Sequence, residues 1–173
     1  MKEKSLGKLL VLAGVFMLIL TGILIAEFYP KHLVRIEDLS SGEIIFEKAA
    51  RPGDNLWVVF INSVESLPVG DHYVLDDSYG ILFTETIFQA PYAGYDREEK
   101  GTLVAPGTMK ISGYDREMKE VTFYAGYDSR HLLFLNGNLL PLYEKANGGD
   151  IIRIKIVDTT ITDMIIRRIM AHE

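Results

Sequence analysis

One segment of the chain gathers polar side chains of the kinds that bind hard cations or small polar ligands. It runs from Ile61 to Tyr73 and interrupts two apolar stretches with a proline and several polar residues. Carboxylate, amide and hydroxyl oxygens bind hard cations, and they also hydrogen-bond polyols and amines. One interpretation is a site in which four residues converge at one end of a sheet: Asn62, Ser63, Glu65 and Asp71. The alternative is an elaborate turn, in which Asn62 and Ser63 bond the backbone and both carboxylates face solvent.

The tripeptide Gly-Tyr-Asp occurs three times, beginning at Gly94, Gly113 and Gly126. Its spacings of nineteen and thirteen residues are too irregular for a repeat architecture, which holds a fixed period. We interpret the tripeptides as equivalent turns at strand ends, where Gly adopts unusual dihedrals and Asp accepts backbone hydrogen bonds. The functional alternative is a stacking platform for a ligand, built from these tyrosines: Tyr95, Tyr114 and Tyr127.

Signatures of catalysis and of metal binding are absent from the sequence. The four histidines, at positions 32, 72, 131 and 172, do not have a metal-ligand spacing. There is no cysteine, no Gly-x-Ser-x-Gly motif and no phosphate-binding glycine loop. The only tryptophan, Trp57, lies in an apolar stretch and is expected in the core. We therefore expect a non-enzymatic protein with neither a cofactor nor a metal site.

The charge of the chain disfavours nucleic acid as a partner. The formal net charge is −6, and residues 1–28 contain three lysines and two glutamates, which leaves −7 for the remainder. Nucleic-acid binding draws most of its affinity from Lys and Arg that neutralise phosphates. An acidic domain without basic clusters lacks that source of affinity.

Residues 9–26 are eighteen consecutive residues without a charge. A helix needs about 20 apolar residues to cross the roughly 30 Å of a bilayer core, and this run is apolar all round. Lys2, Lys4 and Lys8 precede it, so the N-terminus is expected in the cytoplasm and the main domain outside. A cleaved signal peptide is the alternative, but Leu24 is a poor residue for position −3 before a cleavage at Ala26. We expect a single-pass protein of the cell membrane, anchored through residues 9–26.

After Pro30 the sequence changes to short stretches with period-two alternation, separated by Gly, Asn, Asp and Pro. No helical stretch lies between them, which argues against a parallel α/β fold. Turn signals are strongest at Pro52-Gly53-Asp54, at 77–80, at Asn136-Gly137 and at 147–150. The predicted strands are Glu43–Ala49, Asn55–Ser63, His72–Asp76, Ile81–Gln89, Thr102–Ala105, Thr108–Ser112, Glu120–Ala125, Leu132–Leu135 with Asn138–Tyr143, and Ile151–Val157.

The expected fold class is therefore mainly β, an antiparallel barrel or sandwich of about nine strands behind one transmembrane helix. The expected organisation is an anchor over 1–28, a linker over 29–42, a β domain over 43–158 and a tail over 159–173. In the tail, Ile161, Met164, Ile165 and Ile169 recur at helical spacing and a threonine can cap the start. A short helix is favoured there, with a β-branched strand as the alternative.

The stretch from Phe60 to Asp71, Phe-Ile-Asn-Ser-Val-Glu-Ser-Leu-Pro-Val-Gly-Asp, followed about twenty residues later by Ala93-Gly94, resembles domain-of-unknown-function family 1850. The family pattern is roughly aromatic-x-His-Ser-Val-Glu-x-Thr-Pro-Val-x-Glu and then a glycine-rich turn. The resemblance covers about Gly42 to Val157. It departs from the pattern at Asn62, Leu67 and Asp71, which stand for His, Thr and Glu.

Members of that family look like small anchored β proteins that are often encoded beside TRAP transporters with TAXI-type solute-binding proteins. The resemblance therefore implies an accessory protein that contacts a transporter permease or a solute-binding protein. The residues themselves leave a second hypothesis open, a free-standing module for a small ligand or a cation. Its site would be the cluster Asn62, Ser63, Glu65 and Asp71, with Gly94 and Tyr95 from the glycine turn.

Overall fold

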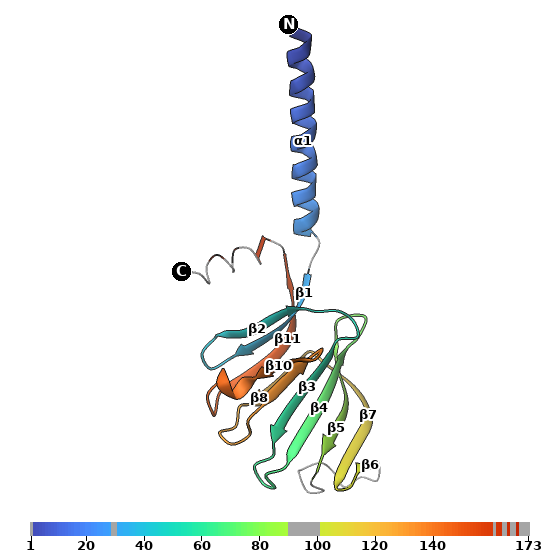
Figure 1. Cartoon of the computed structure of the whole chain (residues 1–173), viewed down its shortest axis with the longest axis vertical. Coiled ribbons are helices and arrows are strands. Elements are labelled where there is room, and N and C mark those ends of the chain that lie inside the picture. Colours follow the sequence, from blue (N-terminus) through green and yellow to red (C-terminus); the bar gives the residue numbers. More distant parts are fainter. Residues whose placement is uncertain are drawn as a thin grey trace. The chain divides into compact units, whose positions relative to one another are not determined.

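The computed structural model of the chain describes residues 2–28, 31–89, 101–160, 162, 163, 166 and 169, except for the side chains of 2–6, 9, 10, 26–28 and 31. The chain divides into two compact units. Residues 32–157 form one unit, and residues 1–31 with 158–173 form the other. Figure 1 shows the strands of the first unit and the long helix of the second.

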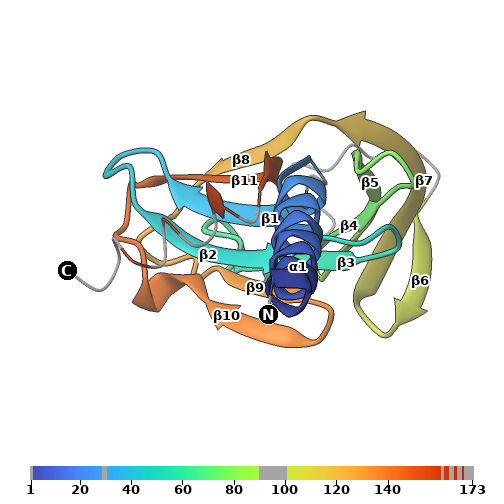
Figure 2. The same cartoon turned by 90° about the horizontal axis from the view of Figure 1, so that it is seen from above.

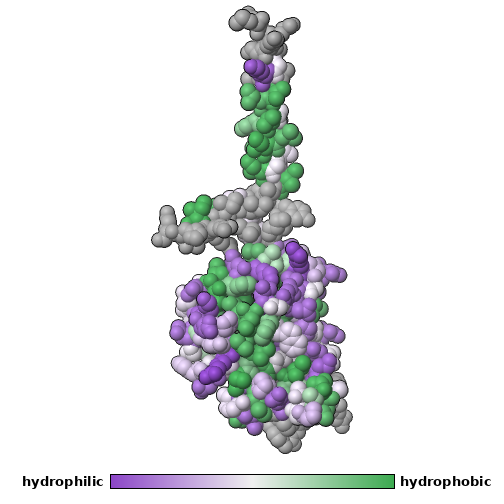
Figure 3. All heavy atoms as spheres, viewed as in Figure 1, coloured by the Kyte–Doolittle hydropathy of each residue, from purple (hydrophilic) through white to green (hydrophobic). Residues whose placement is uncertain are grey.

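The long helix, α1, spans Lys2–Phe28 and contains 27 residues. It forms where the sequence has its uncharged run, which contains no proline to interrupt the backbone ladder. Its described large apolar side chains from Val11 to Ile25 are exposed, from 41% at Leu20 to 75% at Leu18. Figure 3 shows this stretch as a mostly hydrophobic surface. Within the described residues, no helix combines the length and the hydropathy needed to cross a membrane.

The smaller sheet has four strands in the order β2 (Ile44–Ala49), β1 (Lys31–Asp38), β11 (Ile151–Thr159) and β8 (Glu120–Tyr124). Period-two alternation sets its two faces. Val34 and Ile36 of β1 are at most 2% exposed, and Ile152 and Ile154 of β11 are fully buried. The residues between them carry charges and occupy the opposite face.

The larger sheet has seven strands in the order β10-β9-β3-β4-β5-β7-β6. Its strand pairs are antiparallel, as the registers of neighbouring strands show. A single-turn 3₁₀ helix, η1 (Leu142–Glu144), follows β10. The strands are β3 (Asn55–Ile61), β4 (Pro68–Leu75), β5 (Ile81–Phe88), β6 (Thr102–Ala105), β7 (Thr108–Met118), β9 (Leu132–Leu135) and β10 (Asn138–Pro141).

One cluster of buried side chains joins the two sheets. Val34, Ile152 and Ile154 of the smaller sheet belong to it together with Leu56 and Leu133 of the larger sheet. In Figure 2, β8 and β11 of the smaller sheet lie on the opposite side of the domain from β9 and β10 of the larger one. The prediction of a mainly β, antiparallel fold is confirmed, with two sheets that share a core.

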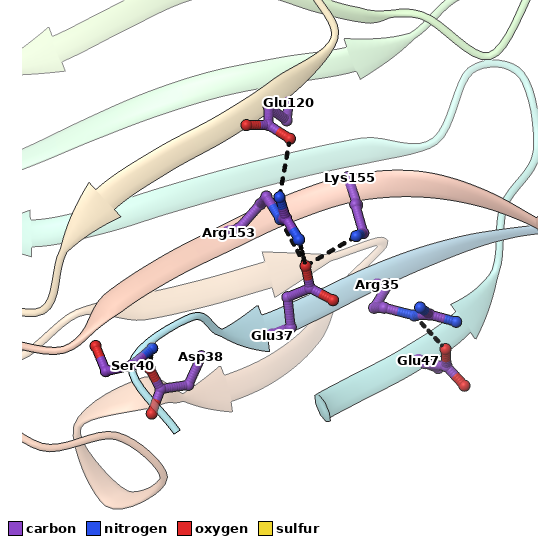
Figure 4. A network of polar contacts seen from close by, with 8 residues as sticks. All are labelled: Arg35, Glu37, Asp38, Ser40, Glu47, Glu120, Arg153 and Lys155. Atoms are coloured by element: carbon purple, nitrogen blue, oxygen red, sulfur yellow. Dashed lines mark hydrogen bonds and ion pairs between the residues drawn. The ribbon is translucent and has the colours of Figure 1, made fainter. Parts of the chain in front are cut away.

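The predicted linker over 29–42 differs from the structure, because Lys31–Asp38 is strand β1. Val34 and Ile36 alternate with Arg35 and Glu37 as in a strand, and the segment pairs with β2 and β11. Arg35 and Glu37 obscured this pattern in the sequence, yet they form ion pairs with Glu47 and Arg153 on the outer face of the sheet (Figure 4). With β1, the described residues contain eleven strands rather than about nine.

The predicted turn at Asn136-Gly137 is confirmed. Leu135 pairs with Asn138 across a two-residue loop, and both loop residues have positive φ, 49° at Asn136 and 77° at Gly137. Two successive positive φ values match the right-handed twist of a hairpin, and Asn and Gly adopt them most readily. The Asn136 side chain also accepts a hydrogen bond from the Asn55 backbone N–H at 2.8 Å, which ties this hairpin to β3.

The two Gly-Tyr-Asp tripeptides that the structure describes, at Gly113 and Gly126, do not form equivalent turns. The tripeptide at Gly113 lies inside β7, where Gly113 (φ 81°) and Asp115 (φ 39°) form an irregularity in the pairing with β5. The tripeptide at Gly126 follows β8 and starts a loop. The first tripeptide, with Gly94 and Tyr95, lies outside the described residues.

In the tail, the described residues Thr162, Asp163, Ile166 and Ile169 are helical. The Thr160 hydroxyl accepts a hydrogen bond from the Asp163 N–H at 3.1 Å, and the Asp163 carboxylate accepts one from the Thr160 N–H at 3.4 Å. This reciprocal pair is a capping box, which starts a helix. The predicted short helix agrees with these positions, while Ile161, Met164 and Ile165 lie outside the described residues.

Candidate functional site

The structure places Asn62, Ser63 and Glu65 in the turn between β3 and β4. The Asn62 side-chain oxygen accepts hydrogen bonds from the backbone N–H groups of Val64 (2.8 Å) and Glu65 (3.3 Å). This is an Asx turn, in which the amide replaces a backbone group. Ser63 and Glu65 are exposed. The amide of Asn62 is therefore used to build the turn.

The structure does not bring Asp71 to that turn. Asp71 pairs with Val58 and Thr86, three rungs of the ladder from the Ile61–Pro68 pair beside the turn, which is roughly 10 Å along the strand. Asp71 is half-buried. The pKa of Tyr114 is above its ordinary value because Tyr114 is partly desolvated and because the Asp71 charge is nearby. Among the described residues, no group of three His, Cys, Asp or Glu side chains is arranged to hold a metal ion.

A different set of residues surrounds a small cavity, which we call the His131 cavity. It lies between the loop after β8 and the segment from η1 to β11, and it encloses about 60 Å³. A space of that size accommodates a few water molecules or a small functional group of a larger ligand. The lining residues are Ala125, Gly126, Tyr127, His131, Leu142, Tyr143, Ala146, Asn147 and Gly148.

Backbone hydrogen bonds fix the two loops against each other. The Gly149 N–H donates to the Ala125 carbonyl at 2.6 Å, and the Ala125 N–H donates to the Asp150 carbonyl at 2.8 Å. At the other side, the Leu142 N–H donates to the His131 carbonyl at 3.0 Å. Leu142 itself is fully buried and anchors η1 in the core. These backbone hydrogen bonds fix the walls of the cavity in place.

Arg130, directly before His131, has a positive φ of 42°. This conformation costs a non-glycine residue about 1 kcal/mol, and such strain persists only where the surroundings impose it. The surroundings here are two anchored carbonyls. The Ser129 carbonyl accepts from the Ile61 N–H at 2.7 Å, and the His131 carbonyl accepts from Leu142. The strained residue turns the chain so that His131 enters the domain.

His131 is 7% exposed. Its ring stacks with Phe123, at 4.8 Å between centroids, and with Phe60, at 5.3 Å. Burial lowers the pKa of His131 to about 4, because desolvation penalises the charged imidazolium. The imidazole is therefore neutral at physiological pH, with one nitrogen donor and one nitrogen acceptor. Neither nitrogen has a hydrogen-bond partner in the described part of the chain.

Two tyrosines flank the cavity at the surface, Tyr127 at 85% exposure and Tyr143 at 51%. The Tyr127 ring lies against the backbone of Gly148, since a Cβ atom there would be 2.6 Å from the ring Cγ. The Asn147 side-chain amide and both tyrosine hydroxyls have no hydrogen-bond partner among the residues that the structure describes. The cavity thus combines aromatic faces with several uncharged donors and acceptors.

Sequence reasoning missed His131 and Asn147 as site residues. Tyr127 was weighed as part of a stacking platform, but with Tyr95 and Tyr114 as its partners. The sequence feature that could have pointed to the site is the presence of two loops rich in Gly with Asn or Asp, at 126–128 and 147–150. Only the pairing of β8 with β11 brings these loops together.

Trp57 was expected in the core, and the structure corrects this. Leu56 and Val58, its neighbours in β3, are each 4% exposed and point into the core, so Trp57 lies on the opposite face of the sheet. There it stacks on His72 at 4.3 Å. The imidazole of His72 lies within 2.9 Å of both Asn55 Oδ1 and Thr84 Oγ1. This cluster is saturated by its own contacts.

Figure 4 shows a charged network on the outer face of the smaller sheet. The Glu37 carboxylate contacts the Arg153 guanidinium and lies 2.9 Å from Lys155 Nζ, while Arg153 also reaches Glu120 at 3.7 Å. Burial alone would raise the pKa of Glu37, but hydrogen bonds and charges from Lys155 and Arg153 lower it below its ordinary value. Each charge in this network has a partner, so it supports the sheet and offers no unpaired group to a ligand.

Comparison of the chain with protein-family models, with curated proteins and with solved structures found no match.

Proposed function

We propose that this chain is a membrane-anchored β-sandwich module that binds the uncharged end of a small ligand outside the cytoplasm. The observation that carries the proposal is the His131 cavity. His131 is buried, yet no described residue hydrogen-bonds its ring, and the ring borders a space of about 60 Å³. Ligand sites are concave, mostly apolar and supplied with a few unpaired polar groups.

The shared core supports the sandwich arrangement. Two sheets that bury one set of side chains between them form the layered architecture in which loops cluster at the ends. The His131 cavity lies between two such loops, one after β8 and one before β11. Binding sites are frequently on loops that a rigid scaffold positions.

The character of α1 supports the anchor. Its described side chains from Val11 to Ile25 include no charge, and the large apolar ones are 41–75% exposed. Exposing so many large apolar side chains to water is unfavourable, because each contributes roughly 2 kcal/mol when it leaves water. A lipid environment removes that cost. The lysines before the run favour a cytoplasmic N-terminus and an extracytoplasmic β unit.

The place beside a TRAP-type transporter stays a prediction of the family resemblance. In that setting the module would act as an accessory that contacts the permease or its solute-binding protein. Copurification of the tagged full-length chain from native membranes tests this part separately. Recovery of a stoichiometric permease or solute-binding protein supports the accessory role, and recovery of the chain alone contradicts it.

Ligand binding is tested on the full-length chain in lipid nanodiscs by NMR of its four histidines. The probes are D-glucose and acetamide, each at about 10 mM, where even weak complexes form, and acetate and glycine betaine are the charged controls that should not bind. A probe that shifts the His131 signal but leaves the His72 signal unchanged supports the site. His72 is the internal control because its ring is saturated by Asn55 and Thr84. If no probe moves His131, the proposal is wrong.

The anchor is tested by extracting native membranes with alkaline carbonate and by adding protease to the outer side. We expect the full-length chain to stay in the membrane pellet and its β unit to be digested from outside. Release by carbonate, or digestion only after the membrane is opened, would contradict the anchor or its orientation.

A further inference from the structure

The lining of the His131 cavity restricts the charge of its ligand. None of the nine lining residues is Asp, Glu, Lys or Arg, and His131 is neutral at physiological pH because its pKa is about 4. A bound ion would lose hydration without gaining a countercharge, which is strongly unfavourable in a partly buried site. An uncharged ligand avoids that cost.

The polar side chains of the cavity match a ligand that both donates and accepts hydrogen bonds at several points. His131 offers one donor and one acceptor, Asn147 offers both kinds, and each tyrosine hydroxyl can serve as either. Hydroxyl groups are matched to such a set because each is itself a donor and an acceptor. A purely apolar ligand would leave these groups unpaired, which costs affinity.

The two tyrosines match a ligand with a flat apolar face. The Tyr127 ring is 85% exposed and rests on the glycine backbone at 148. An aromatic ring supported in this way offers contact area with little loss of conformational entropy on binding. The C–H face of a sugar ring is apolar while its rim carries hydroxyls, so one ligand can satisfy both parts of the site.

The volume fixes how much of the ligand enters. About 60 Å³ holds roughly four water molecules at 15 Å³ each, so a few hydroxyl groups fit inside but a whole sugar ring does not. The ring would remain outside, against Tyr127 and Tyr143. This arrangement accommodates a sugar that is the end of a chain as readily as a free one.

We infer that the His131 cavity binds the terminal residue of a neutral saccharide, with its hydroxyls on His131 and Asn147 and its ring against Tyr127. This inference rests on the proposed ligand-binding function. The shared chemistry is a neutral hexose ring, and it has two sources, a free sugar and the end of a glycan. Their affinities separate the two, because only a glycan adds contacts beyond the first ring.

The test is saturation-transfer NMR and titration on the full-length chain in nanodiscs, which avoid glycoside detergents that would compete. The probes are glucose, maltotriose and N,N′,N″-triacetylchitotriose. The charged control is glucuronate, and the control without several hydroxyls is cyclohexanol. We expect a neutral saccharide to bind and both controls to fail. A higher affinity for a trisaccharide than for glucose identifies a glycan end as the ligand, and equal affinities identify a free sugar.

Matched variants place the binding. Tyr127→Ala and His131→Gln are expected to weaken saccharide binding by roughly tenfold or more, as loss of an aromatic or hydrogen-bonding contact does at a site centre. Tyr124→Ala is the control, because Tyr124 is 70% exposed and does not line the cavity. Equal weakening by the control variant would overturn the assignment.

The outcomes separate this inference from the proposed function. If acetamide shifts His131 while no saccharide does, the saccharide inference fails and the ligand-binding function stands. If neither a saccharide nor any other probe affects His131, both fail.

Discussion

The neutral state of His131 predicts a loss of stability when the solution is mildly acidified. The pKa of His131 in the folded chain is about 4, and in the unfolded chain it returns to an ordinary value near 6.5. Between these values the unfolded chain binds a proton that the folded chain does not bind. Stability therefore falls as the pH drops from about 6.5 towards 4.

The magnitude follows from the difference between the two pKa values. Each unit corresponds to about 1.4 kcal/mol, so a folded pKa of about 4 costs roughly 2 kcal/mol at pH 5 and about 3 kcal/mol at pH 4, relative to pH 7.5. Glu37, Asp38 and Asp76 also have lowered pKa values in the folded chain. Their stabilising contributions are lost only as the pH falls below their ordinary values near 4.

The assay compares the parent chain with His131→Phe and His131→Gln. Urea unfolding in nanodiscs is followed by the fluorescence of Trp57, the only tryptophan. The comparison cancels every other titrating group, including His72, whose pKa burial also lowers. We expect the free energy of unfolding of the parent to drop by about 2 kcal/mol more than that of either variant between pH 7.5 and pH 5. Equal drops in the parent and a folded variant would refute the reasoning, as would an NMR titration of His131 near pH 6.5.

Three further changes test other parts of the structure. Thr86 is fully buried, and its hydroxyl has no hydrogen-bond partner in the described chain. Thr86→Val should therefore raise the free energy of unfolding by about 1 kcal/mol, whereas Thr86→Ser should lower it, and urea unfolding measures both. Gly148→Ala should displace the Tyr127 ring, because the new Cβ would lie 2.6 Å from the ring Cγ, and it should lower the free energy of unfolding by about 1–2 kcal/mol. In a double-mutant cycle with Tyr127→Ala most of this loss should disappear, while additive effects would contradict the contact. Glu37→Gln removes the carboxylate that Arg153 and Lys155 share and should lower the free energy of unfolding by about 2 kcal/mol. Glu120→Gln, at the exposed edge of the network, should lower it less, and thermal unfolding measures both.

Local patterns in the sequence were sufficient for the β elements. Ten of the eleven strands overlap a predicted stretch, although β4 begins at Pro68 rather than His72 and β7 continues to Met118 rather than ending at Ser112. The overlap arises because side-chain direction in a strand depends only on neighbouring positions. The hairpin at Asn136-Gly137 is similarly local, since the two residues accept positive φ without tertiary help. Strand β1 was missed because its alternating charges resembled a linker, and only its place between β2 and β11 gives those charges partners.

The candidate site was predicted less well, since it depends on contacts between distant residues. Asn62 was recognised as a polar residue of interest, and the alternative of a turn-forming role was stated, but its bonding to Val64 and Glu65 required the structure. Asp71 seemed close to Asn62 in the sequence, yet the strand carries it away at about 3.3 Å per residue. Trp57 was assigned to the core because an apolar run gives no indication of which face each residue occupies.

By itself, the sequence determined the uncharged helical run, the mainly β character of the remainder and the position of most turns, because each depends on residues within a few positions of one another. The tertiary structure decided the strand order, the membership of β1 and the assembly of the His131 cavity. His131 and Asn147 are separated by sixteen positions in the chain, and they meet because β8 pairs with β11 and the Leu142 N–H bonds the His131 carbonyl. The burial that holds His131 neutral arises from Phe60 and Phe123 on separate strands, so its chemistry exists only once both sheets have packed.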